Sequence, residues 1–281
     1  MTIFEAYNET KKELENAGIE DYVFEAKQII KHITGFSNAE ILMNYTNRLT
    51  GCQQNRLTAI IRQRELRYPL QYIFGEWSFY GRDFYVGPGV LTPRADTETL
   101  IEKSLEFLKG KAAPRILDLC AGSGCIGITL AALVPDSRVL MVEKFREAAE
   151  YARKNISRNG AANVALIEGD VFERAGAEDG GYDLIVSNPP YIPDGELDTV
   201  SPETKYEPET ALAGGGDGLD FYRAIAGSYG KSLKRGGMML FEAGIGQAGS
   251  IKKIFDVSGF SQIGAAEDLN GILRAVFAVR S

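Results

Sequence analysis

The chain has 281 residues, of which 44% are hydrophobic and 25% are charged, a balance typical of a globular protein with one main core and a smaller module. Its formal net charge of −7 counts against a protein that covers nucleic acid with a basic face. The sequence has no long apolar run that would span a membrane, and its start lacks the pattern of a secretory signal. We expect a cytoplasmic protein without direct contact to nucleic acid or membrane, and we expect it to act as a monomer.

The cysteines and the histidine of the chain give little sign of metal chemistry. Cys52, Cys120 and Cys125 are sparse and odd in number, which favours a reducing compartment over a disulfide scaffold. There is no Cys-x-x-Cys pair, and His32 is the single histidine. We expect no metal site, and we expect His32 to pack within a helix.

The first part of the chain, to about residue 68, predicts short helices. Apolar residues recur there at helical spacing: Val23, Ala26, Ile30 and Ile33. Asp21 is a candidate N-cap for this helix, and Gly35 is a candidate end. Two further pairs have the spacing of a capping box: Ser37 with Glu40, and Thr50 with Gln53. Pro69 is expected to close the last helix, and the charges of residues 1–85 nearly balance.

Residues 70–93 change in character and predict a β-hairpin. Alternating aromatic runs at 77–79 and 84–86 flank Gly81, and 87–89 is a Gly-Pro-Gly breaker. We expect residues 1–85 to form a helical substrate-recognition domain with the hairpin as its linker. Residues 86–281 are then expected to form a catalytic domain.

From about residue 97 onward, helical and strand-like segments alternate, which predicts an α/β domain with a parallel sheet covered by helices on both faces. The strand-like runs are 115–119, 138–142, 164–167, 184–186, 238–241 and 272–279. Ligands of such sheets bind at the carboxyl ends of the strands. The residues that follow these strands are therefore the candidates for a site.

A glycine-rich turn follows the first of these strands. Residues 122–127 match Gly-x-Gly-x-x-Gly, a weak signal by itself that also fits a nicotinamide oxidoreductase. Asp118 ends the strand, and a carboxylate there would repel a pyrophosphate but favour the ammonium and sulfonium of S-adenosylmethionine. Glu143 ends the second strand, nineteen positions beyond Gly124, where it can accept hydrogen bonds from ribose hydroxyls of either cofactor. Asp118 therefore favours the sulfonium cofactor.

The tetrapeptide Asn188-Pro189-Pro190-Tyr191 follows the fourth strand and predicts a site for a planar NH₂ group. An amide nitrogen is a poor nucleophile because its lone pair is delocalised. The side-chain oxygen of Asn188 and the carbonyl of Pro189 can accept its two hydrogens, which turns the lone pair toward a methyl donor. Proline holds that carbonyl rigidly and adds no competing donor. Tyr191 is expected to pack against the acceptor and exclude water.

These residues resemble the release-factor glutamine N5-methyltransferases, the PrmC/HemK family, over nearly the whole chain. The blocks that carry the resemblance are 69–75, 90–94 with 97–98, 187–192, 207–208, 211–212, 216–223, 268–271 and Arg274. The resemblance implies a Rossmann-like seven-stranded S-adenosylmethionine methyltransferase domain, and a small N-terminal helical domain joined to it by the hairpin. It implies methyl transfer to the glutamine of the Gly-Gly-Gln motif in class I peptide-chain release factors, which are the expected protein partners.

The resemblance also implies the roles of individual residues. It assigns to the cofactor Cys120, Ala121, Gly122, Ser123, Gly124, Glu143, Val171 and Asn188, and we expect Asp118 and Asp170 to belong to the same site. Asn188, Pro189, Pro190 and Tyr191 are expected to hold the glutamine. This chain has Cys120 and Ala121 where the family usually has Gly and Thr, Glu143 where it has Asp, and Val171 where an aromatic is frequent. Phe172 beside Val171 is a candidate to replace that aromatic.

Other hypotheses remain open at this point. The same tetrapeptide binds exocyclic NH₂ groups, so the main alternative is an amino-methyltransferase acting on adenine or guanine in nucleic acid. It would require base flipping and a positive strand-binding surface, which the acidic composition disfavours. A non-catalytic binding module is a third hypothesis, which a turnover assay would decide. Residues 214–216 are three glycines without a following Lys-Ser or Lys-Thr, so we expect a turn near the site and no phosphate loop.

Overall fold

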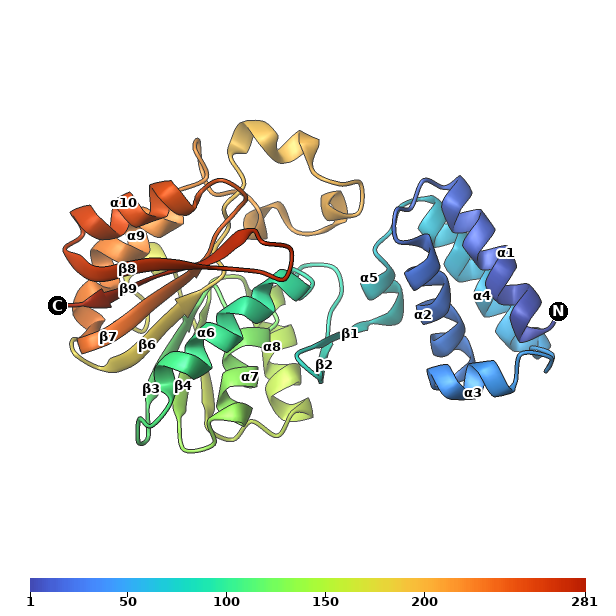
Figure 1. Ribbon diagram of the computed structural model, residues 1–281, viewed down its shortest axis with the longest axis horizontal. Coiled ribbons are helices and arrows are strands. Elements are labelled where there is room, and N and C mark those ends of the chain that lie inside the picture. The colour runs from blue at the N-terminus through green and yellow to red at the C-terminus, as the bar shows by residue number, and fades with distance from the viewer. The chain divides into compact units, whose positions relative to one another are not determined.

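The computed structural model describes all residues, 1–281, and the chain forms two compact units (Figure 1). The helical unit comprises Met1–Gly75 together with the short segment Ser201–Tyr206, and the sheet unit comprises Glu76–Val200 and Glu207–Ser281. The hairpin expected to belong with the helices is therefore part of the compact unit that contains the sheet. None of the helices is long and apolar enough to cross a membrane.

The helical unit consists of five helices around a core of isoleucine and leucine. These are α1 (Ile3–Asn16), α2 (Tyr22–Thr34), α3 (Asn38–Met43), α4 (Gly51–Glu65) and α5 (Leu70–Phe74). Both predicted capping boxes are confirmed, at Ser37 and Thr50, and Gly35 ends α2 with a left-handed φ of 72°. Asp21 occupies the predicted N-cap position of α2, although its side chain makes no capping hydrogen bond, and Val23 lies within α2 but is 48% exposed.

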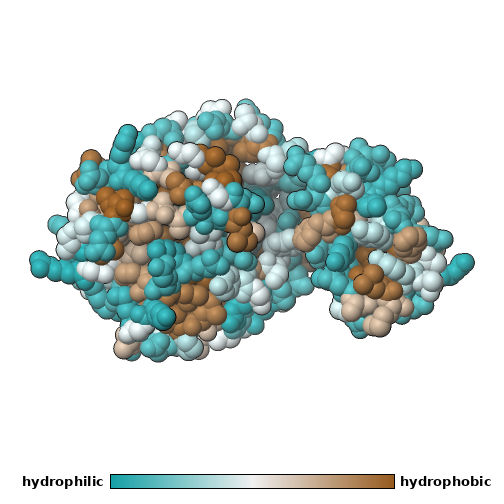
Figure 2. All heavy atoms as spheres, in the orientation of Figure 1, coloured by the Kyte–Doolittle hydropathy of each residue, from teal (hydrophilic) through white to brown (hydrophobic).

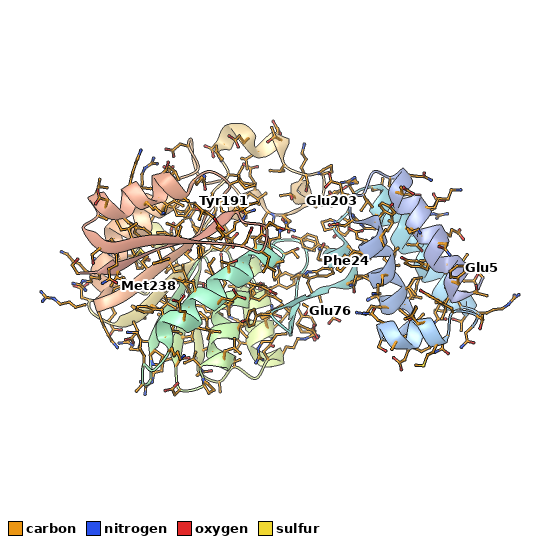
Figure 3. The ribbon with its side chains drawn as sticks, viewed as in Figure 1. Glu5, Phe24, Glu76, Tyr191, Glu203 and Met238 are labelled. Atoms are coloured by element: carbon orange, nitrogen blue, oxygen red, sulfur yellow. The ribbon has the colours of Figure 1, made fainter.

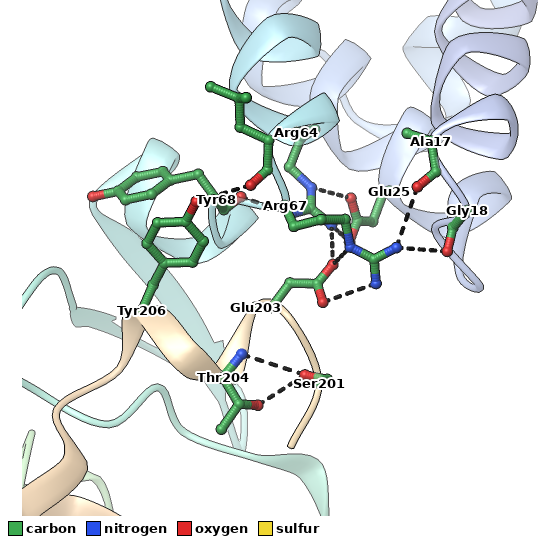
Figure 4. A network of polar contacts seen from close by, with 11 residues as sticks. Ala17, Gly18, Glu25, Arg64, Arg67, Tyr68, Ser201, Glu203, Thr204 and Tyr206 are labelled. Atoms are coloured by element: carbon green, nitrogen blue, oxygen red, sulfur yellow. Dashed lines mark hydrogen bonds and ion pairs between the residues drawn. The ribbon is translucent and has the colours of Figure 1, made fainter. Parts of the chain in front are cut away.

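An ion-pair network lies inside the helical unit (Figure 4). The side chain of Arg64 is almost fully buried, and its guanidinium donates to Glu25 at 2.7 Å and to Glu203 at 3.0 Å. Arg67 donates to the other oxygen of Glu203 at 2.9 Å. The hydroxyl of Tyr206 donates to the backbone carbonyl at the end of α4 at 2.9 Å. These bonds join segment 201–206 to helices that precede it by more than 100 positions in the chain.

The sheet unit contains a seven-stranded sheet, which confirms the expected fold class. Its strands are β3 (Arg115–Leu119), β4 (Arg138–Glu143), β5 (Val164–Glu168), β6 (Tyr182–Ser187), β7 (Leu233–Glu242), β8 (Phe260–Glu267) and β9 (Leu273–Arg280). Their order is β5-β4-β3-β6-β7-β9-β8, with β9 antiparallel to both neighbours and the other pairs parallel. The strand β8 was not located from the sequence, because as an edge strand with Gly264 and two alanines it lacks the alternating β-branched pattern.

Helices cover both faces of this sheet, as the alternation of the strands predicts. In β3, Ile116 joins the core beneath α6 (Glu98–Leu108), α7 (Cys125–Leu133) and α8 (Arg146–Arg158), whereas Leu117 joins the core beneath α9 (Asp220–Tyr229) and α10 (Ala248–Val257). Short 3-10 turns occupy the connections: η1 (Ala95–Thr97), η2 (Val171–Glu173), η3 (Asp194–Thr199), η4 (Thr204–Tyr206), η5 (Glu209–Ala211) and η6 (Gly230–Ser232).

The predicted hairpin is confirmed as β1 (Glu76–Phe79) and β2 (Arg82–Tyr85). Phe79 and Phe84 are buried in the same core as α6 and α7. The backbone of Tyr85 exchanges hydrogen bonds with the side chain of Asn155 on α8, at 2.6 and 3.1 Å. The hairpin is therefore attached to the sheet unit by both apolar and polar contacts.

Candidate functional site

A cavity of about 320 Å³ lies at the carboxyl ends of β3, β4 and β6 in the sheet unit. This is the edge at which ligands of parallel sheets bind. The sequence-predicted residues that line it are Cys120, Ala121, Gly122, Ser123, Glu143, Asp170, Val171, Asn188 and Pro190. Asp118, Gly124, Pro189 and Tyr191 do not line it. The structure thus brings most, but not all, of the candidate residues around one cavity.

The loop after β3 follows a backbone path that favours glycine. Gly122 and Gly124 have φ values of 55° and 80°, in the left-handed region. Cys120 also has a left-handed φ, of 59°, which costs a non-glycine residue on the order of 1–2 kcal/mol. This conformation gives a physical reason for the glycine that the resemblance expects at position 120. The loop ends where Gly124 precedes the first turn of α7.

Glu143 lies at the end of β4, only 6% exposed, and faces the cavity. One of its carboxylate oxygens accepts a hydrogen bond from the backbone N–H of Gly122, and the other accepts from that of Phe145, both at 2.8 Å. Burial raises the pKa of Glu143, although these two N–H groups lower it. Each carboxylate oxygen has a second lone pair, so Glu143 can hold the loop and still accept from a ligand.

Asp118 lies beneath the loop and is fully buried. Its Oδ2 accepts a hydrogen bond from the backbone N–H of Gly127 at 2.8 Å. A side chain at position 127 would place its Cβ 2.8 Å from that same oxygen, so the close approach requires glycine there. This bond directs Oδ2 toward the first turn of α7, and Asp118 does not line the cavity, so its contact with the charge of the ligand stays a prediction. Burial raises its pKa to about 7.

The acceptor tetrapeptide follows β6 directly. The side chain of Asn188 is half-buried, and its Nδ2 donates to the hydroxyl of Thr97 at 3.3 Å. No backbone N–H donates to the carbonyl of Pro189, so this carbonyl remains available as an acceptor. Tyr191 lies within the sheet unit (Figure 3). Its carbonyl accepts from the side-chain amide of Gln247 at 2.8 Å, and burial raises the pKa of its phenol to about 12.

The triglycine region lies next to this tetrapeptide, as the sequence suggested. Ile192 and Ala213 form a parallel bridge, and the N–H of Gly214 donates to the carbonyl of Ile192 at 2.8 Å. A Cβ at Gly218 would come within 2.3 Å of the carbonyl oxygen of Tyr191. Small residues are therefore required where this loop packs against the acceptor strand.

Two aromatic residues at the cavity, Phe145 and Phe221, were not singled out from the sequence. Phe145 is 39% exposed, and Phe221 forms an edge-to-face pair with Phe172, the aromatic that the sequence did suggest, with centroids 4.9 Å apart. Val171, by contrast, is buried in the core beneath α9. An aromatic two positions after Glu143 was the sequence signal that could have identified Phe145.

Two buried carboxylates also support the site. Glu207 accepts from the backbone N–H of Thr92 at 3.0 Å and pairs with Arg94. Glu242, at the end of β7, accepts from the hydroxyl of Thr97 at 2.5 Å. Glu207 belonged to one of the motif blocks, but nothing in the local pattern distinguished Glu242.

Comparison with known proteins agrees with this geometry. Residues 5–75 match the family model of the PrmC N-terminal domain, and residues 96–216 match that of the methyltransferase small domain. A release factor glutamine methyltransferase of Geobacter sulfurreducens is 40% identical over 98% of this chain and 95% of its own length. One of Thermodesulfovibrio yellowstonii is 37% identical over 92% of each chain.

The chain belongs to the release factor glutamine methyltransferases. This confirms the resemblance on which the fold class and the reaction were predicted. As a member of this family, the protein is an S-adenosylmethionine-dependent methyltransferase. Among solved structures, a T. thermophilus 16S rRNA N2 G1207 methyltransferase in complex with AdoMet and guanosine is 20% identical. The match covers 73% of this chain and 50% of that methyltransferase chain, with a TM-score of 0.55. At this identity it shows a similarity of fold alone.

The residues around the cavity fit the cofactor of these methyltransferases. Its volume is within the range of small-molecule sites, roughly 300–1,000 Å³. Glu143 supplies an acceptor at the end of β4, where a ribose is bound in related folds, and aromatic side chains lie on the neighbouring turns. The structure of this methyltransferase therefore places a cavity of suitable size for a nucleoside beside the tetrapeptide that is predicted to bind an amide.

Proposed function

We propose that this protein methylates the side-chain amide nitrogen of the glutamine in the Gly-Gly-Gln motif of class I peptide-chain release factors. The observation that carries the proposal is the arrangement of Asn188 beside the cavity. Its Nδ2 is bonded to Thr97, which leaves Oδ1 with both lone pairs for a ligand. Membership of the family supports glutamine as the group that brings an NH₂ to this oxygen.

The chemistry follows from two acceptors at fixed positions. Asn188 Oδ1 and the carbonyl of Pro189 accept the two hydrogens of the substrate amide, which turns the nitrogen lone pair out of conjugation and toward the methyl group. They also stabilise the positive charge that develops on nitrogen. The proton is lost readily from the methylated amide, so no strong general base is required. Holding the reactants in line can contribute roughly 7–11 kcal/mol to the lowering of the barrier.

We assign different residues of the cavity to different parts of the cofactor. We assign Glu143 to the ribose hydroxyls, and the aromatic side chains of Phe145 and Phe172 to the adenine. The turn 120–124 would approach the cofactor through its backbone, with Asp118 holding the start of α7 from below. When bound, S-adenosylmethionine supplies an electrophilic methyl group on a sulfonium.

The helical unit is proposed to recognise the protein substrate. Figure 2 shows hydrophobic groups among hydrophilic ones on its surface. Leu42 and Met43, neighbours on α3, are 63% and 75% exposed, and Phe4 on α1 is 53% exposed. Exposed apolar side chains of this kind favour a protein partner over a nucleic acid.

The deciding experiment is transfer of labelled methyl from S-adenosylmethionine, with folded release factor, tRNA and DNA compared side by side. We expect label on release factor alone, and mass spectrometry should place one methyl on the glutamine. Replacing that glutamine by glutamate should abolish transfer, because a carboxylate has no N–H to donate. Label on tRNA or DNA with release factor untouched would contradict the proposal and support the alternative, an exocyclic-amine methyltransferase.

A variant of the enzyme tests the acceptor geometry separately. Asn188→Ala should lower turnover by roughly 10²–10³-fold, as removal of one preorganised hydrogen-bonding group does elsewhere. Cofactor binding, measured by calorimetry, should weaken much less. A folded Asn188→Ala protein with near-normal turnover would exclude Asn188 as the amide acceptor.

A further inference from the structure

A chain of hydrogen bonds connects Asn188 to a buried carboxylate. Asn188 Nδ2 lies 3.3 Å from Thr97 Oγ1, and Thr97 Oγ1 lies 2.5 Å from Glu242 Oε2. Thr97 and Glu242 are each 2% exposed. The three side chains come from three elements, η1, the end of β6 and the end of β7. Because β6 and β7 are parallel neighbours, their carboxyl ends place Asn188 and Glu242 on either side of Thr97.

The chemistry of the three groups fixes the direction of these bonds when Glu242 is ionised. A carboxylate only accepts, so the single hydrogen of the Thr97 hydroxyl must point to Glu242. The Thr97 oxygen can then only accept, so Asn188 presents its NH₂ side to Thr97. Oδ1 is thereby left for the ligand, in the orientation that a substrate NH₂ requires.

Protonation of Glu242 permits the reverse direction. Its O–H donates to the Thr97 oxygen, and the Thr97 hydrogen then points to Asn188, which would present Oδ1 to Thr97. The NH₂ of Asn188 would face the NH₂ of the substrate, and two donors cannot form a hydrogen bond. Such a reversal keeps every buried group of the chain bonded, so the packing of the site does not prevent it.

We propose that ionised Glu242, acting through the hydroxyl of Thr97, sets the orientation of the Asn188 amide, and that these two are positioning residues for the acceptor amide. This inference rests on the proposed function, since Asn188 is the catalytic residue that touches the substrate. Thr97 transmits the charge state of a buried carboxylate to a side chain at the cavity.

The surroundings of Glu242 place its titration within the working range of an enzyme. Burial raises the pKa of Glu242 to about 7, opposed by the hydrogen bond from Thr97 and by the guanidinium groups of Arg274 and Arg94. Asp96 on η1 raises it further. The other titratable groups that face it are Tyr191, Tyr222 on α9 and Cys125 on α7. Turnover should therefore fall as the pH drops below about 7, because the protonated fraction of Glu242 grows.

Three variants separate positioning from packing. Thr97→Val keeps the shape and removes the hydroxyl, Thr97→Ser keeps the hydroxyl, and Thr129→Val is the matched control. Thr129 is also fully buried, on α7, and its hydroxyl has no partner. We expect Thr97→Val to lose 10- to 100-fold in kcat with S-adenosylmethionine affinity within about twofold. Thr97→Ser should restore most of the loss, and Thr129→Val should turn over like the natural protein.

The pH dependence provides the second test. The acid limb of kcat in the natural protein should be absent in Glu242→Gln, whose side chain does not titrate. Two results would overturn the inference. One is an equal loss of kcat in Thr97→Val and Thr129→Val, and the other is an acid limb of kcat that persists in Glu242→Gln. The KM for release factor should change less than kcat, because the orientation of Asn188 acts on the reacting amide.

A substrate-free measurement keeps this inference distinct from the identity of the substrate. The side-chain NH₂ signal of Asn188, assigned in a nitrogen-15 spectrum by its loss in Asn188→Ala, should shift with a midpoint near pH 7. It should stay constant with pH in Glu242→Gln. This result would hold even if release factor proved not to be the substrate. A signal equally pH-dependent in both proteins would overturn the coupling, whatever the enzyme methylates.

Discussion

Glu143 combines two tasks at the scale of a single residue. The same oxygens that face the cavity fix the backbone of Gly122 and Phe145. Glu143 is longer than the aspartate that is usual at this position. Its carboxylate reaches the backbone N–H groups of both Gly122 and Phe145. We therefore expect the cofactor site to depend on Glu143 for its shape as well as for its charge.

The consequence is a graded loss of cofactor affinity. Glu143→Ala should weaken binding of S-adenosylmethionine by about 1–3 kcal/mol, because hydrogen-bond acceptors are removed from both the ribose and the loop. Glu143→Gln retains one oxygen and should lose less. Glu168→Gln is the control, since Glu168 occupies the paired position on β5 but is exposed. Calorimetry that shows equal affinity for all three variants would remove Glu143 from the site.

Asp118 predicts a pH dependence of stability. Burial raises its pKa from 3.8 to about 7, with the charge of Glu143 adding to the effect and the Gly127 N–H opposing it. The folded state therefore holds a proton that the unfolded state releases, and this contribution is full below about pH 4 and is lost as the pH rises through 7. Asp118→Asn cannot titrate but keeps an oxygen for Gly127. We compare the free energies of unfolding of the two proteins, measured with denaturant at pH 5 and pH 8. Between these pH values the variant should gain on the order of 1–3 kcal/mol of stability relative to the natural protein. The same dependence of unfolding free energy on pH in both proteins would contradict this prediction.

At the scale of elements, the loop between Tyr191 and α9 determines where the acceptor strand lies. Gly214 and Gly218 pack against the backbone of Tyr191, and Gly218 has a left-handed φ of 72°. Gly216, two positions away, faces open space. The glycines of this loop are therefore not equivalent, although the sequence places them close together.

This difference gives a matched pair of variants. Gly218→Ala should lower kcat by roughly 10- to 100-fold, because a Cβ 2.3 Å from the Tyr191 carbonyl must displace the tetrapeptide. Gly216→Ala should be close to the natural protein. Turnover is measured at saturating S-adenosylmethionine, with near-ultraviolet circular dichroism to verify folding. Equal kcat values in two folded variants would show that the loop does not position the acceptor.

The elements also show how far the sequence could be interpreted. Six of the seven strands were located because apolar runs mark them, and the tetrapeptide was located because two prolines after a strand are rare. The edge strand β8 was missed because its residues are small or polar. The bond from Thr97 to Glu242 joins residues 145 positions apart, and local patterns do not report such contacts. The bond from Gly127 to Asp118 was not expected for a similar reason, since it depends on how α7 packs against β3.

At the scale of the whole molecule, recognition of a folded substrate should depend on more than the cavity. We expect the double variant Leu42→Lys and Met43→Lys to lower kcat/KM for folded release factor by roughly tenfold or more, because apolar contact area is replaced by charge. A short peptide with the Gly-Gly-Gln motif should react equally with the variant and the natural protein. Val257→Lys, at an 84% exposed apolar residue on α10, is the control. A double variant that retains full kcat/KM for release factor would exclude this surface of α3 from recognition.

The helical unit is built from two segments of the chain, which the ribosome synthesises at different times. Arg64 and Glu203 are 139 positions apart in the chain. At about 5–20 residues per second, Glu203 is synthesised roughly 7–28 s after Arg64. During that interval the buried guanidinium has Glu25 as its carboxylate partner, and segment 201–206 is absent. The helices at the start of the chain therefore acquire their last segment only after the ribosome has produced the acceptor tetrapeptide.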